Sequence, residues 1–110
     1  MSDSNPEITP HDAADRPADT LLIDVRGENE WVAGHAPHAT HIPLDSLTAD
    51  AVPAGATVMC VCKTGGRSTA ATTMLREAGI NAANVTGGMS AWSAAGLPIV
   101  RDDNEVGTVI

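Results

Sequence analysis

Aromatic residues are nearly missing from this sequence, which has two tryptophans and no tyrosine or phenylalanine. A core must therefore be built from smaller apolar side chains, although we expect Trp31 and Trp92 to pack on it. Hydrophobic residues make up 43% of the chain, a fraction that excludes a disordered protein and fits a globular one. The length of 110 residues predicts a single domain over 1–110, with a folded core at about 7–100 and a flexible polar tail at about 101–110.

Basic residues are also scarce. Six Lys and Arg stand against 14 Asp and Glu, which gives a formal net charge of −8. Such a surface repels nucleic acid and anionic membranes, so we expect neither as a partner. No apolar run approaches the roughly 20 residues that cross a bilayer, and the first residues lack the basic and apolar regions of a signal peptide. We therefore expect a cytoplasmic protein.

Cysteine is limited to Cys60 and Cys62, too few for a disulfide framework. Residues two apart on a strand share a face with Cα atoms about 6.5 Å apart, whereas a disulfide needs Cβ atoms about 4 Å apart. We expect two thiols, of which Cys60 is a packing residue deeper along the strand. A zinc site would need ligands beyond His35, His38 and His41, so we expect no metal.

Apolar runs of strand length alternate with segments of helical periodicity. Runs that are apolar and β-branched throughout are typical of buried parallel strands. The strands are expected at residues 20–25, 40–43, 57–62 and 84–86. The helices are expected at residues 10–14, 28–33, 68–78 and 89–95, the last preceded by a tight turn at 87–88. This alternation predicts an α/β fold in which a small parallel sheet carries helices on both faces.

The clearest strand leads into the candidate site. It ends at Cys62, and a loop of Lys63, Thr64, Gly65 and Gly66 then enters a helix. Ligands of parallel folds bind beyond the carboxyl ends of the strands. The two glycines allow successive N–H groups to turn inward as an anion-binding nest, and the helix N-terminus adds positive potential. Such surroundings favour a thiolate, so Cys62 is the predicted nucleophile.

Neighbouring residues have two interpretations each. Lys63 and Arg67 either bind an anionic substrate or are solvated loop charges, and both interpretations stay open. Asp24 with Arg26 either supports the loop from behind or satisfies backbone donors at a strand end, and we favour the second. Ser68 is expected to be the N-terminal cap of its helix, although its hydroxyl could also reach the sulfur.

Residues 62–68, Cys-Lys-Thr-Gly-Gly-Arg-Ser, resemble the active-site loop of the rhodanese family. Other segments resemble family motifs in the same order, namely Asp24-Val25-Arg26, Gly34-His35-Ala36-Pro37 through Ile42-Pro43, Gly87-Gly88-Met89-Ser90-Ala91-Trp92 and Gly96-Leu97-Pro98. The resemblance covers about residues 7–100. His38 stands where the family usually has glycine and Ala36 where it often has isoleucine, which predicts a different loop shape around Pro37.

The resemblance implies a rhodanese-type fold and a thiosulfate sulfurtransferase-like activity. Cys62 would take a sulfur atom from a small anionic donor, hold it as a persulfide in the 63–68 loop, and pass it to a thiol or protein acceptor. No metal or organic cofactor is implied. A rhodanese-like binding or regulatory module without turnover ranks second. A Cys-based phosphatase or arsenate reductase ranks third, because the segment between Cys62 and Arg67 is one residue shorter than in the phosphatase relatives.

Overall fold

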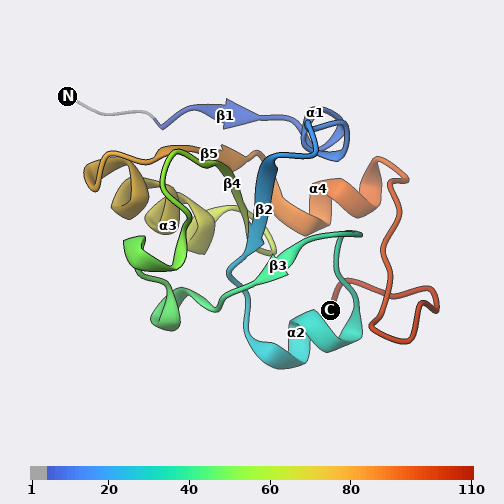
Figure 1. The fold of residues 1–110 in the computed structure, drawn as a ribbon. Coiled ribbons are helices and arrows are strands. Elements are labelled where there is room, and N and C mark those ends of the chain that lie inside the picture. Colours follow the sequence, from blue (N-terminus) through green and yellow to red (C-terminus); the bar gives the residue numbers. More distant parts are fainter. Residues whose placement is uncertain (1–4) are drawn as a thin grey trace.

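The computed structural model describes residues 5–110 and contains one parallel sheet of five strands in the order β1-β5-β4-β2-β3 (Figure 1). All four strand pairs are parallel. The strands are β1 (Glu7–Ile8), β2 (Thr20–Asp24), β3 (Thr40–His41), β4 (Thr57–Val61) and β5 (Asn81–Val85). The predicted α/β class and parallel sheet are confirmed. The edge strand β1 was not predicted, because two residues are too short to produce a readable pattern.

Helices cover both faces of the sheet, as predicted. They are α1 (Pro10–Ala14), α2 (Glu28–Ala33), α3 (Gly66–Glu77) and α4 (Gly88–Ala94), with short 3-10 helices at Leu44–Ser46 and Ala49–Ala51. α3 packs on one face and α1 with α4 on the other (Figure 1). No helix among residues 5–110 is long and apolar enough to cross a membrane.

The core has two halves, because successive side chains of a strand point to opposite faces. On β4, Val58 and Cys60 face the α3 side, whereas Met59 and Val61 face the α1 and α4 side. Trp92 is 1% exposed in the second half, and its indole N–H donates to the Pro98 carbonyl at 2.8 Å. The sheet therefore holds β4, and the residue that follows it, firmly between two packed layers.

Trp31 does not join this core, contrary to our expectation. Its ring stacks on His35 at a centroid distance of 3.6 Å and on His41 at 4.8 Å. Both imidazoles are also fixed by hydrogen bonds to backbone carbonyls, His35 to Trp31 and His41 to Arg26. Within residues 5–110, no group of three or more His, Cys, Asp or Glu side chains is placed to hold a metal ion.

The end of the polar tail is joined to the rest of the domain by backbone hydrogen bonds, whereas residues 101–106 are exposed. The Thr108 amide donates to the Ala33 carbonyl at 2.9 Å, and Gly107 is buried with its amide on the Ile99 carbonyl at 3.0 Å. Val109 packs against the core on the α1 and α4 side. Figure 1 shows the C-terminus beside α2. Most of the contacts of the tail are backbone hydrogen bonds. Such bonds produce no hydrophobic pattern, so the sequence did not predict them.

Candidate active site

Cys62 directly follows β4 at the carboxyl edge of the sheet, where the chain turns into α3. The start of α4 holds this turn from behind: the Met89 amide donates to the Cys62 carbonyl at 2.7 Å and the Ser90 amide to the Lys63 carbonyl at 2.9 Å. Gly88 makes this approach possible. It has φ +62, and a Cβ there would lie 2.4 Å from the Cys62 carbonyl oxygen. Gly88 was assigned to a tight turn from the sequence. In the structure it makes a close contact that supports the loop.

Two donors meet the sulfur of Cys62. The Gly65 amide lies 3.1 Å from Sγ and the Ser68 hydroxyl 3.3 Å from it. Gly65 can present its amide because it has φ +121, a conformation that L side chains rarely adopt. Gly65, not Ser68, is the N-cap of α3, so the capping interpretation of Ser68 is wrong. Ser68 is fully buried and its hydroxyl reaches the sulfur instead.

Gly66 does not need the conformational freedom that we assigned to it. It is the first residue of α3, its φ is not positive, and a Cβ there would find open space. The prediction that both glycines supply unusual backbone angles is therefore wrong for Gly66. Only Gly65 shapes the turn in this way.

The surroundings give the two thiols opposite tendencies. Burial raises the pKa of Cys62, but the Ser68 hydroxyl and the backbone amides of Ser68, Gly65 and Thr64 outweigh it, so the pKa is lowered overall. Burial raises the pKa of Cys60 to about 11, against a hydrogen bond to Thr72 that lowers it. Cys60 is fully buried in the core half that also contains Cys62. Its expected burial on the same face is confirmed, and only Cys62 is favoured as a thiolate.

Arg67 is paired with a carboxylate, a contact that neither interpretation of the sequence included. Its guanidinium donates to Glu30 of α2 at 2.7 and 2.9 Å. This hydrogen bonding is the main reason that the pKa of Glu30 falls to about 2. Sequence analysis missed Glu30. The two residues are far apart in the chain, and no local pattern signals their contact. Lys63 is half-buried and makes no salt bridge within residues 5–110.

Asp24 and Arg26 form a fully buried ion pair at 2.8 Å. The Arg26 guanidinium also donates to the Gly34 carbonyl at 2.7 Å, and the Arg26 amide donates to the Asp24 carboxylate at 3.0 Å. The pair thus ties the end of β2 to the segment after α2. Because these contacts satisfy backbone groups at a strand end, they match the structural interpretation that we favoured.

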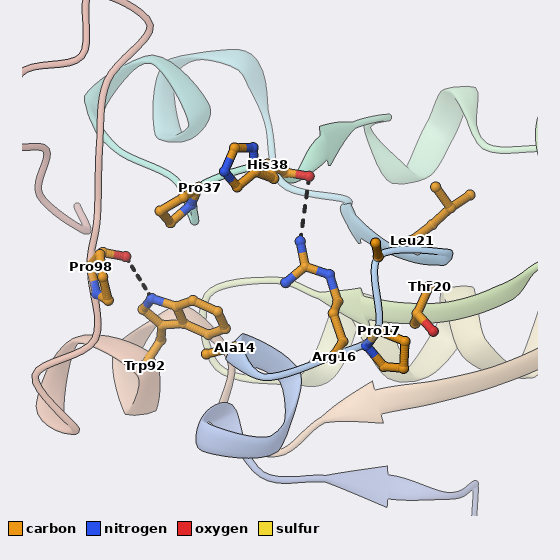
Figure 2. A pocket seen from close by; sticks show the side chains of 10 residues that line it. Ala14, Arg16, Pro17, Thr20, Leu21, Pro37, His38, Trp92 and Pro98 are labelled. Atoms are coloured by element: carbon orange, nitrogen blue, oxygen red, sulfur yellow. Dashed lines mark hydrogen bonds between the residues drawn. The ribbon is translucent and has the colours of Figure 1, made fainter.

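A pocket of about 590 Å³ lies among the residues drawn in Figure 2. Its lining includes Thr20 at the amino end of β2 and the side chains of Arg16 and Trp92. Arg16 donates to the carbonyl of His38 at 3.4 Å. His38 has φ +64, so it takes up the left-handed conformation for which glycine is favoured. The pocket shares no residue with the 62–68 loop, so we do not place the chemistry there.

Comparison with known proteins gives consistent matches over most of the chain. The family model of the rhodanese-like domain matches residues 9–95. A sulfurtransferase of Allochromatium vinosum is 34% identical over 103 residues, which cover 88% of this chain and 96% of that protein. An uncharacterised protein of Synechocystis is 37% identical over 87 residues, 76% of this chain but only 49% of the relative, so the chain spans about half of its length. The crystal structure of a rhodanese-related protein from Thermoplasma volcanium has a TM-score of 0.81 and 27% identity, covering 86% of this chain and 97% of that one.

Proposed function

Because this chain belongs to the rhodanese-like domain family, we propose that it is a sulfurtransferase that carries sulfur as a persulfide on Cys62. The observation that carries the proposal is the convergence of the Gly65 amide and the Ser68 hydroxyl on Sγ. These donors favour a thiolate before the reaction. They would also stabilise the terminal sulfur anion after it, as an oxyanion hole stabilises oxygen. The relative named a sulfurtransferase supports the assignment.

The proposed reaction has two steps of covalent catalysis. In the first, the Cys62 thiolate attacks the outer sulfur of an anionic donor such as thiosulfate. The bond between the two donor sulfurs breaks, and sulfite leaves with the electron pair, which gives Cys62–S–S⁻. In the second, the thiolate of a small thiol or of a protein attacks the terminal sulfur and leaves with it, which restores the Cys62 thiolate. Neither step requires a metal or organic cofactor.

The loop from Lys63 to Ser68 is proposed to bind the donor and the persulfide. Gly65 and Ser68 contact the sulfur directly, and the amide of Thr64 adds to the field that favours the thiolate. Gly66 begins α3, whose N-terminus contributes positive potential. Lys63 contributes charge. Asp24 and Arg26 support the loop indirectly, because they fix the end of the neighbouring strand β2. A cytoplasmic location suits a free thiol of this kind.

The two other candidate functions receive less support. A phosphatase or arsenate reductase would use the loop arginine to bind a tetrahedral oxyanion, but Arg67 is already held by Glu30. A binding module without turnover would have no use for a thiol with a lowered pKa.

The test is sulfur loading on the purified protein. Mass spectrometry after incubation with thiosulfate should show the mass increase of one sulfur atom, and the added mass should disappear on treatment with cyanide. Cys62→Ser should abolish loading and thiocyanate formation while circular dichroism stays unchanged. Loading of Cys62→Ser at the rate of the natural protein would refute the assignment. If no donor loaded sulfur onto the natural protein, that result would favour the binding module without turnover.

A further inference from the structure

Three cationic side chains belong to the carboxyl edge of the sheet around Cys62, and two of them are already neutralised. Arg26 is fully buried against Asp24. Arg67 is bound by both carboxylate oxygens of Glu30. Lys63 is the one that forms no ion pair among the residues described. An arriving anion therefore meets less positive charge than the sequence of the loop suggests.

Glu30 is held in place independently of Arg67. It occupies the third position of α2, and its Oε1 accepts the Gly27 amide at 3.1 Å. The Glu30 side chain is 17% exposed and that of Arg67 is 41% exposed, so the pair lies at the protein surface with the carboxylate on its inner side. Since the pKa of Glu30 falls to about 2, it is ionised at any pH at which Cys62 reacts. The carboxylate thus carries its charge throughout the working range of the site.

Arg67 lies in the first turn of α3, between Gly65 and Ser68, the two residues that contact the reacting sulfur. The pKa of Arg67 is raised, first by the hydrogen bond to Glu30 and also by the charges of Glu30, Cys62 and Asp24. A cation that interacts with the Cys62 thiolate also interacts with a donor bound next to that thiolate. Glu30 offsets this attraction. The offset matters most for the donor with the largest negative charge, because the interaction scales with the product of the charges.

We propose that Glu30 shifts the donor preference of this site, so that sulfur donors that carry one negative charge compete better with donors that carry two. The inference rests on the proposed sulfur transfer and names the donor class that gains from Glu30, which is organic thiosulfonates and persulfides relative to thiosulfate. Methanethiosulfonate is a suitable probe, because a methyl group replaces one charged oxygen of thiosulfate and the reacting bond is the same. The thiolate attacks the outer sulfur, the sulfur–sulfur bond of the donor breaks, and methanesulfinate leaves in place of sulfite. Both reactions give Cys62–S–S⁻.

The experiment compares the kcat/KM of the two donors in Glu30→Gln. Glutamine keeps the size of the side chain and the hydrogen bond to the Gly27 amide but removes the charge that offsets Arg67. The ratio of thiosulfate to methanethiosulfonate kcat/KM should rise about three- to tenfold, the effect of one charge at several ångströms. The gain should shrink at high salt. Adding Arg67→Leu to Glu30→Gln should abolish it.

Glu28→Gln is the matched control. It removes the same charge from the same helix, and Glu28 makes no ion pair within residues 5–110. Equal effects of Glu30→Gln on both donors would overturn the proposal and leave Glu30 a helix cap. So would an equal change of the ratio in Glu28→Gln. If neither donor loaded the natural protein, the sulfur-transfer proposal itself would fail, which is a different result from a ratio that does not change.

Discussion

At the scale of single residues, the site depends on which backbone amide faces the sulfur. Gly65 and Gly66 are adjacent and chemically identical, yet only Gly65 has a positive φ and an amide on Cys62 Sγ. The sequence presents them as an equivalent pair. Their difference arises from where α3 begins, and helix starts are the boundaries that sequence patterns locate least well. The two glycines are therefore expected to respond differently to the same substitution.

Gly65→Ala should lower stability, whereas Gly66→Ala should not. At Gly65 a side chain is forced into a conformation that costs about 1–3 kcal/mol. At Gly66, where a Cβ meets open space in the first turn of a helix, alanine should be neutral or stabilising by up to about 1 kcal/mol. Urea unfolding measures the stability, and mass spectrometry measures loading at Cys62, which should fall only in Gly65→Ala. Equal losses in the two variants would mean that the Gly65 amide has no special role.

At the scale of elements, the loop after β4 lies between the N-termini of α3 and α4, which contact different parts of it. The start of α3 faces the sulfur, and the start of α4 donates to the carbonyls of Cys62 and Lys63. The first N–H groups of a helix have no partner within it, so they are free for both uses. This arrangement explains why Gly88 approaches the loop so closely. It also means that α4 fixes the position of the proposed nucleophile through the backbone of the loop.

Gly88→Ala should impair both stability and sulfur loading. The new Cβ would lie 2.4 Å from the Cys62 carbonyl oxygen and 2.5 Å from that of Lys63, so the loop or α4 must move. Gly96→Ala is the matched control, because Gly96 also has a positive φ of +75 but nothing lies within 4 Å of its Cβ. Both variants should lose about 1–3 kcal/mol from backbone strain. Only Gly88→Ala should also slow loading, and normal loading in that variant would contradict the role of α4.

The elements that the sequence predicted correctly are those with a strong local pattern. The apolar run before Cys62 became β4, and the helical spacing after it became α3. The resemblance to the rhodanese family indicates the loop after β4 as the place of the proposed nucleophile. The contacts that local pattern could not supply join distant segments, as Glu30 with Arg67 and Gly88 with Cys62 do. Such contacts depend on how elements are placed relative to one another, and periodicity carries no information about that placement.

At the scale of the whole molecule, the last residues complete the side of the domain that carries α2. His35 and Val100 exchange two backbone hydrogen bonds of 2.9 Å, and Val100 also forms a bridge with Val106. The His35 ring lies 3.3 Å from the Asp102 carboxylate. These contacts connect the C-terminus to the helix that presents Glu30. The polar composition of the tail conceals this role, because backbone groups make most of the contacts.

The packing of the tail can be tested with Gly107→Ala. A Cβ at Gly107 would lie 2.6 Å from the Gly34 Cα and 3.0 Å from the Ala33 carbonyl oxygen, both of them backbone atoms that cannot rotate away. The variant should lose about 1–3 kcal/mol of stability, the range for overpacking. Hydrogen exchange at the Thr108 amide should also accelerate, because its bond to Ala33 weakens. Val106→Ala is the control, since that side chain is 84% exposed in the same segment and its loss should cost little. If the tail were loose, Gly107→Ala would leave stability unchanged, and the Thr108 amide of the natural protein would already exchange rapidly. Those two results together would contradict the packed arrangement.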